Sequence, residues 1–141
     1  FTQVFDRFGT AGKGELVARM QDLMGLYDSL KICKLSLLGG VTPSLALEWL
    51  NLATGWEMGL EEFLLAGERI FTLKRLFNLG CGVTRRDDTL PERILRLPRR
   101  EGGAGDNLPP LEVMLEDYYR VRGWDAEGRP TPERLRALGL A

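Results

Sequence analysis

The stretch that decides the fold runs from residue 60 to residue 79 and reads LEEFLLAGERIFTLKRLFNL. Its apolar side chains recur at intervals of three and four residues, which places them on one face of an α-helix. Glu61 and Glu62 lie in the first turn and Arg75 lies near the end, so these charges suit the helix dipole. Gly67 falls within the apolar face and would let a second helix approach closely. We predict one long helix here.

Helical spacing continues through most of the remaining chain. Thr42-Pro43 and Thr131-Pro132 each combine a hydroxyl cap with a proline suited to the first helical position. No segment shows the alternating pattern of a β-strand, and residues 98–110 are expected to form a loop rich in glycine, proline and charge. The further helices are expected over residues 16–27, 42–55, 88–97, 110–123 and 131–139.

These patterns predict an all-α, multi-helical fold in a single domain that spans residues 1–141. Apolar residues make up 44% of the chain, which is enough to fill a core. The chain begins with Phe1 rather than Met, and we interpret it as part of a longer protein. We expect the core to bury a set of large apolar side chains, namely Trp49, Phe63, Ile70, Phe71, Phe77 and Leu115.

Composition argues against several functional classes. The formal net charge is −1, so the chain has no broad electrostatic attraction to nucleic acid or to an anionic membrane. No apolar run approaches the ~20 residues that a membrane span requires, and no signal peptide is visible. We therefore expect a cytoplasmic location without nucleic-acid or membrane partners. The chain has no histidine, which excludes a Ser/His/Asp or Cys/His hydrolytic site within it.

The run DSLKICK at residues 28–34 carries the most informative side chain, the thiol of Cys33. The neighbouring Lys31 and Lys34 would stabilise a negatively charged thiolate, the form that ligates metals. The alternative is a small buried core residue, which is common for a free cysteine. Asp28 is equally ambiguous, because its carboxylate would either accept hydrogen bonds from a ligand or bond the backbone at the helix end.

The other conspicuous residues are interpreted as structural. Cys81 lies between two glycines in an expected turn. Residues 85–88 read RRDD and are expected to form local ion pairs and to cap the next helix. Tyr118, Tyr119 and Trp124 could stack on bases, but no basic groove accompanies them, so we expect them to pack in the core.

Taken in order, several segments resemble the C-terminal part of the tungsten-containing aldehyde:ferredoxin oxidoreductases, from about Gly14 to Leu140. Residues 28–34 resemble that family's Asp-x-x-Gly-Leu-Cys motif, with Lys31 where the family usually has glycine. The further blocks that fit the family are GERI at 67–70, RLFN at 75–78, RDDTLP at 86–91 and YYRVRGWD at 118–125.

The resemblance implies that this chain is the C-terminal part of a larger enzyme that oxidises aldehydes to carboxylic acids. In that family the motif's cysteine is the fourth ligand of a [4Fe-4S] cluster, a role that falls here to Cys33. The motif's acid and the residue before the cysteine help to hold one of two pterins that chelate tungsten or molybdenum. These roles fall to Asp28 and, through its backbone, to Ile32.

The resemblance also implies partners. The remaining cluster ligands and the catalytic residues would come from the N-terminal part of the same enzyme, so no catalytic residue is assigned here. Electrons would leave through the cluster to ferredoxin. The family's cluster needs four thiolates, and this chain supplies only one cysteine of the motif. We therefore expect the isolated chain to bind neither iron nor tungsten and to oxidise no aldehyde. Its surface around residues 28–34 should then be exposed or loosely ordered.

The main alternative is a non-catalytic helical interaction domain that keeps the family's shape without its cofactors. A Cys-x-x-Cys-x-x-x-Cys motif elsewhere in the full protein would favour the enzyme over this alternative. A nucleic-acid-binding domain is a third possibility, but it requires a basic face that this composition does not supply.

Overall fold

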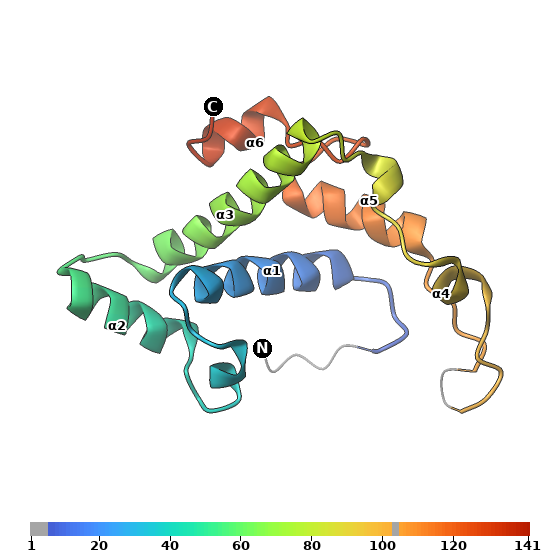
Figure 1. The fold of residues 1–141 in the computed structure, drawn as a ribbon, viewed down its shortest axis with the longest axis horizontal. Helices are drawn as coiled ribbons and strands as arrows, with labels where there is room; N and C mark the ends of the chain where they lie inside the picture. The colour runs from blue at the N-terminus through green and yellow to red at the C-terminus, as the bar shows by residue number, and fades with distance from the viewer. Residues whose placement is uncertain (1–5, 103–104) are drawn as a thin grey trace.

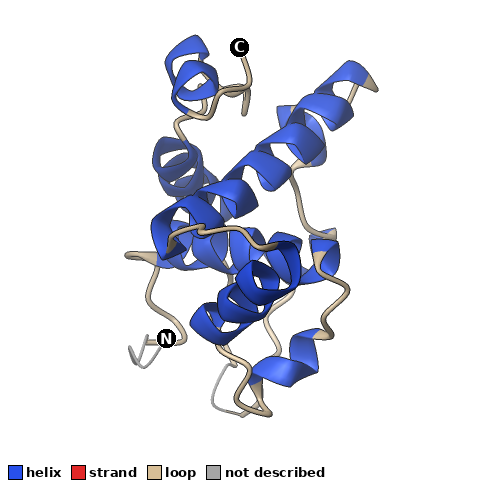
Figure 2. Ribbon diagram, turned by 90° about the vertical axis from the view of Figure 1, so that its left-hand side faces the viewer, coloured by secondary structure: helices blue, strands red, loops and turns tan. Residues whose placement is uncertain are grey.

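The computed structural model describes residues 6–102 and 105–141, and these ranges consist of helices and connecting loops (Figure 2). The α-helices are α1 (Lys13–Ser29), α2 (Pro43–Thr54), α3 (Leu60–Gly80), α4 (Glu92–Arg96), α5 (Leu111–Arg122) and α6 (Pro132–Ala137). Two short 3-10 helices, η1 (Lys34–Leu37) and η2 (Arg85–Asp87), lie between them. The described part has no β-strand beyond one isolated bridge, so the all-α prediction is confirmed.

Helices α2 and α6 begin where the Thr-Pro signals place them, whereas the helix expected over residues 16–27 extends from Lys13 to Ser29. Thr42 Oγ1 accepts a hydrogen bond from the backbone N–H of Leu45 at 3.2 Å, and Thr131 caps α6 in the same way. The piece expected from 88 to 97 is shorter and is confined to α4. The loop expected over 98–110 is present in its described part, and residues 103 and 104 lie outside the described residues. None of the described helices combines the length and the apolar character that a membrane crossing needs.

The fold is organised by α1, which packs against both α3 and α5 (Figure 1). At the contact with α3, a Cβ on Gly67 would lie 2.6 Å from the carbonyl oxygen of Asp22, so glycine is needed for this approach. At the contact with α5, the backbone N–H of Gly14 donates to Oδ2 of Asp117 at 3.1 Å. The close approach predicted for Gly67 is therefore confirmed.

The core predicted from the apolar periodicity is only partly correct. Phe63 is buried, and Ile70, Phe71 and Leu115 are half-buried. The prediction is wrong for Trp49 and Phe77, which are 47% and 72% exposed. Helical spacing shows that a face is apolar, but it does not show whether another element covers that face. The side chains that α2 does contribute to the core are Ala46 and Leu47, which pack with Leu23, Leu26, Tyr27 and Phe63.

Candidate functional site

The chain leaves α1 through a tight turn within residues 28–34, here called the motif segment. The backbone N–H of Ile32 donates to the carbonyl of Tyr27 at 2.9 Å, and that of Lys31 donates to the carbonyl of Asp28 at 3.2 Å. These two bonds form the Schellman motif, in which the residue after the C-cap adopts a left-handed conformation. Lys31 is that residue, with a φ of 59°. The turn therefore redirects the chain just before the candidate thiol.

Lys31 adopts a left-handed conformation that glycine provides at the other helix ends with the same turn. The same pair of hydrogen bonds follows η1, α3, α5 and α6, where the left-handed residues are Gly40, Gly82, Gly123 and Gly139. A Cβ in this region costs about 1–2 kcal/mol, because it crowds the following carbonyl oxygen. The lysine at the end of α1 thus keeps the backbone path of a glycine turn and adds an exposed, charged side chain.

Tyr27 anchors the chain on both sides of the motif segment. Its side chain is fully buried, and its hydroxyl donates to the carbonyl of Val41 at 2.7 Å. Burial raises the pKa of Tyr27 above its ordinary value of 10.0. Ile32 is half-buried and packs against the cluster that contains Tyr27, Leu23 and Ala46. Since the Ile32 side chain faces the core, its backbone is the part available to a ligand.

The other two predicted site residues lie at the surface. Cys33 is a free, exposed thiol in extended backbone, and it forms the N-cap of η1. The interpretation of Cys33 as a small buried core residue is therefore wrong in this chain. Asp28 is also exposed, at the last turn of α1. The fold thus places Asp28, Ile32 and Cys33 on one short turn, with a carboxylate and a thiol both open to solvent.

The donor set of the motif segment fits a site completed by other groups. Within residues 6–102 and 105–141, no three Cys, Asp or Glu side chains converge on a common point that would hold a metal ion. Cys33 can therefore offer one soft sulfur ligand, and Asp28 one hydrogen-bond acceptor. A [4Fe-4S] cluster uses four thiolates, so this turn supplies a part of such a site.

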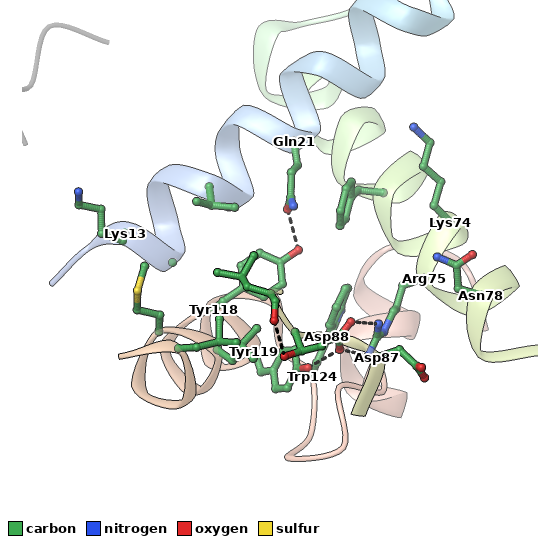
Figure 3. A pocket seen from close by; sticks show the side chains of 18 residues that line it. Lys13, Gln21, Lys74, Arg75, Asn78, Asp87, Asp88, Tyr118, Tyr119 and Trp124 are labelled. Carbon is green, nitrogen blue, oxygen red and sulfur yellow. Dashed lines mark hydrogen bonds and ion pairs between the residues drawn. The ribbon is translucent and has the colours of Figure 1, made fainter. Parts of the chain in front are cut away.

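A second feature is a groove of about 680 Å³ between α1, α3 and α5 (Figure 3). Arg75 is buried at its edge and donates two hydrogen bonds to the carboxylate of Asp88, at 2.9 and 2.6 Å. Its third bond reaches the carbonyl of Gly128 at 2.8 Å. The Tyr119 hydroxyl also donates to Asp88, and burial, reinforced by Asp88, raises the pKa of Tyr119 to about 12. These polar groups use their hydrogen-bonding capacity on one another, so we interpret them as stabilising the fold.

This network corrects two sequence-based interpretations. Arg75 was expected to complement the helix dipole, but it is buried and pairs with Asp88. Residues 85–88 do not form the expected local ion pairs, because Arg85 instead reaches Glu112 in α5 at 2.5 Å. The expected cap is displaced as well, since Asp87 accepts the backbone N–H of Thr84 and so caps η2 rather than the next helix. That bond lowers the pKa of Asp87.

Arg122 forms a third polar centre, where α5 meets α1. Its buried guanidinium donates to Asp22 at 2.6 Å, to the carbonyl of Ala18 at 3.0 Å and to Gln21 at 2.9 Å. Burial raises the pKa of the Asp22 carboxyl, and the hydrogen bond and charge of Arg122 partly offset this rise. Tyr118 packs beside this guanidinium and donates to Gln21, so it is structural, as predicted.

Sequence reasoning missed both buried arginines. The burial of Arg75 could have been inferred from its position, because it lies four residues after Phe71 and eight after Gly67, on the same helix face. A cation on an apolar helix face requires a buried partner. The partners, Asp88 and Asp22, could not be identified from spacing alone, since Asp22 lies 100 residues from Arg122.

Comparison with known proteins adds independent evidence. A family model described as aldehyde ferredoxin oxidoreductase, domains 2 and 3, matches residues 1–140. The chain is 39% identical over 129 residues to the tungsten-containing aldehyde ferredoxin oxidoreductase of Pyrococcus abyssi, and 39% identical over 130 residues to that of Pyrococcus furiosus. The corresponding protein of Thermococcus kodakarensis is 37% identical over 130 residues. These matches cover 91–92% of this chain, which spans about a fifth (21%) of the length of each relative.

Proposed function

Because this chain belongs to the aldehyde ferredoxin oxidoreductase family, we propose that it is the C-terminal part of a tungsten-pterin enzyme that oxidises aldehydes to carboxylic acids. One observation carries the proposal. The free thiol of Cys33 and the carboxylate of Asp28 are both exposed on a turn that is otherwise anchored in the core. A side chain pair exposed in this way is available to a cofactor held by the rest of the enzyme.

The proposed reaction converts an aldehyde and one water into a carboxylic acid, two protons and two electrons. When bound, the tungsten-pterin group would supply the oxidation chemistry, and the [4Fe-4S] cluster would supply the exit for electrons toward ferredoxin. The contribution of this chain is to bind and orient these groups. It contains no histidine, and we assign it no catalytic residue.

Three residues would share the binding role. Cys33 would supply one thiolate to the cluster, held in place by the turn at Lys31 and by the hydrogen bond from Ser36 N–H to its carbonyl, 2.8 Å long. Asp28 would accept hydrogen bonds from a pterin, and Ile32 would contact it through its backbone. The Tyr27–Val41 hydrogen bond fixes the turn, so these groups would be preorganised before the cofactor arrives.

The proposal divides the cofactor site between two parts of the enzyme. One thiolate and a few backbone contacts supply little of the binding free energy that a four-thiolate cluster requires. We therefore expect the isolated 141-residue chain to bind neither iron nor tungsten and to oxidise no aldehyde. Stoichiometric metal on the anaerobically purified chain would contradict this division.

The chain offers a matched pair of cysteines for the decisive test. Cys33 and Cys81 are both free and exposed, but Cys81 follows α3 and lies outside the motif segment. In the full-length enzyme, Cys33→Ala should lower the iron content and change the electron paramagnetic resonance signal of the cluster. Cys81→Ala should leave both unchanged.

If Cys33→Ala retains the normal signal and iron content, the ligand assignment is wrong. If the unmutated full-length protein contains neither iron nor tungsten, the alternative of a non-catalytic interaction domain is favoured instead. Metal analysis therefore separates the role of Cys33 from the function of the whole protein.

A further inference from the structure

Helix α2 is apolar on two opposite faces, and the described chain covers only one of them. Ala46 and Leu47 face the core. Trp49 and Leu52 lie four and seven residues after Leu45 and so share the opposite face with it. Their side chains are 47% and 77% exposed. An apolar stripe along a helix normally packs against another element. Within residues 6–102 and 105–141, the outward face of α2 therefore lacks a cover.

The exposed apolar surface extends beyond the helix. Trp56 follows the end of α2, is 56% exposed and lines a shallow hollow together with Leu52. Trp49, Leu52 and Trp56 are here called the outer stripe. Large aromatic and aliphatic side chains grouped in this way mark interaction surfaces, because isolated proteins seldom expose contiguous apolar patches.

The charges around the outer stripe restrict what can cover it. Residues 35–68 contain no lysine or arginine, and their only charged side chains are glutamates, at 48, 57, 61, 62 and 68. An anionic lipid surface would be repelled by this border. A second copy related by two-fold symmetry would place like-charged borders together. A partner that fits must therefore present an apolar surface bordered by basic side chains.

The exposed area of the chain and the length of its relatives both fit a cover supplied from outside these residues. The chain exposes 9812 Å², whereas a compact monomer of 15.8 kDa would expose about 7,300 Å². The excess of roughly 2,500 Å² shows that the chain is less compact than a free monomer of the same mass. The matched relatives are about five times as long as the aligned segment, since 129 residues make up 21% of the first one. A polypeptide of that length has ample surface to provide the cover.

We infer that the outer stripe of α2 docks against the part of the same polypeptide that lies outside these 141 residues. The docked surface is apolar and is bordered by lysine or arginine side chains that face Glu48 and Glu57. This inference rests on the proposal that the chain is one part of a larger enzyme. It specifies which face of the chain meets the remainder, and it places that contact on α2, two elements after the motif segment.

The test uses the full-length enzyme, purified without oxygen, with Leu52→Cys as the probe. Reaction with a maleimide, located by mass spectrometry, should be at least about 100-fold slower in the native enzyme than after unfolding. The matched control is Glu133→Cys in α6, whose parent side chain is 76% exposed and is charged. Its native and unfolded rates should be similar. Rapid labelling of Leu52→Cys in the native enzyme would overturn the inference.

A second measurement avoids any substitution near the interface. Hydroxyl-radical footprinting of the unmutated enzyme should protect Trp49 and Trp56 to the level of Trp124, which is 7% exposed and serves as an internal reference. Light scattering on the same sample gives the number of chains. Protection seen only in dimers would assign the stripe to a second copy and would overturn the inference. An enzyme that holds iron and tungsten but labels rapidly contradicts only this inference, whereas a metal-free enzyme with a covered stripe contradicts only the proposed function.

Discussion

Replacing Lys31 with glycine should stabilise the chain, even though it removes a charged side chain from the candidate cofactor turn. Lys31 has a φ of 59°, in the left-handed region where a Cβ crowds the backbone. Its side chain is exposed. The substitution therefore relieves backbone strain without opening a cavity in the core.

The magnitude follows from two opposing terms. Removing the Cβ relieves about 1–2 kcal/mol of left-handed strain. The greater freedom of glycine in the unfolded chain costs about 0.5–1 kcal/mol in return. Taking the middle of each range, Lys31→Gly should therefore raise the free energy of unfolding by about 0.7 kcal/mol, a factor of roughly 3 in the folding equilibrium.

The assay is urea unfolding of the 141-residue chain, followed by helical circular dichroism. Hydrogen exchange at the Ile32 amide, which bonds the Tyr27 carbonyl across the turn, gives a local readout. Two controls match the change. Lys31→Ala keeps the Cβ and should change stability by less than about 0.5 kcal/mol. Gly82→Lys makes the reverse change in the same turn after α3, where a Cβ meets nothing within 4 Å, and should destabilise. If Lys31→Gly and Lys31→Ala are equally stable, the Cβ of residue 31 causes no backbone strain and the reasoning is wrong.

Three further changes test the packing of the described chain. Gly67→Ala brings a Cβ to 2.6 Å from the carbonyl oxygen of Asp22, so α1 and α3 must separate. The free energy of unfolding, measured with urea, should fall by about 1–3 kcal/mol. An unchanged urea midpoint would contradict the close packing of these helices. Arg122→Ala removes the buried guanidinium and leaves the half-buried Asp22 carboxylate without its cation. The loss of stability, measured by urea unfolding, should be about 3 kcal/mol, at the lower end of the range for breaking a buried ion pair, and a loss below 1 kcal/mol would contradict the burial of Arg122. The folded-state pKa of Tyr119 is raised from 10.0 to about 12, so its contribution is complete below pH 10 and is lost as pH rises toward 12. Between pH 10 and 12, the Tyr119→Phe variant should therefore lose less stability than the unmutated chain. In a titration followed by phenolate absorbance, the variant should lack the tyrosine that ionises at the highest pH. A titration curve identical to that of the unmutated chain would contradict the raised pKa.

Much of the secondary structure follows from local sequence. Helical spacing and the Thr-Pro caps at residues 42 and 131 placed α2 and α6 correctly, because hydroxyl capping and the fixed φ of proline act within a single turn. The close approach at Gly67 was also predictable, because a glycine within an apolar helix face leaves room for a backbone. The caps depend on neighbours a few residues away, whereas the partner that approaches Gly67, Asp22 in α1, lies far away in the chain.

The candidate site was predictable in position but not in geometry. The resemblance of residues 28–34 to a family motif singled out Asp28, Ile32 and Cys33, and the fold places all three on one turn. The exposure of the thiol was expected only from the family resemblance; its neighbours did not show it, because free cysteines are more often buried. The left-handed conformation of Lys31 was likewise not evident, since lysine has no preference for it.

By itself, therefore, the sequence determined which segments form helices, the capped starts of α2 and α6, and the segment that carries the candidate ligands, since helix formation and capping depend on interactions within a turn or two. Only the tertiary structure decided which apolar faces are covered, which is why Phe63 is buried while Trp49 and Phe77 are exposed. It also decided the partners of the buried arginines, as in the pair that Arg122 forms with Asp22. Burial and ion pairing depend on which elements meet in space, and segments distant in the chain meet only when the helices pack.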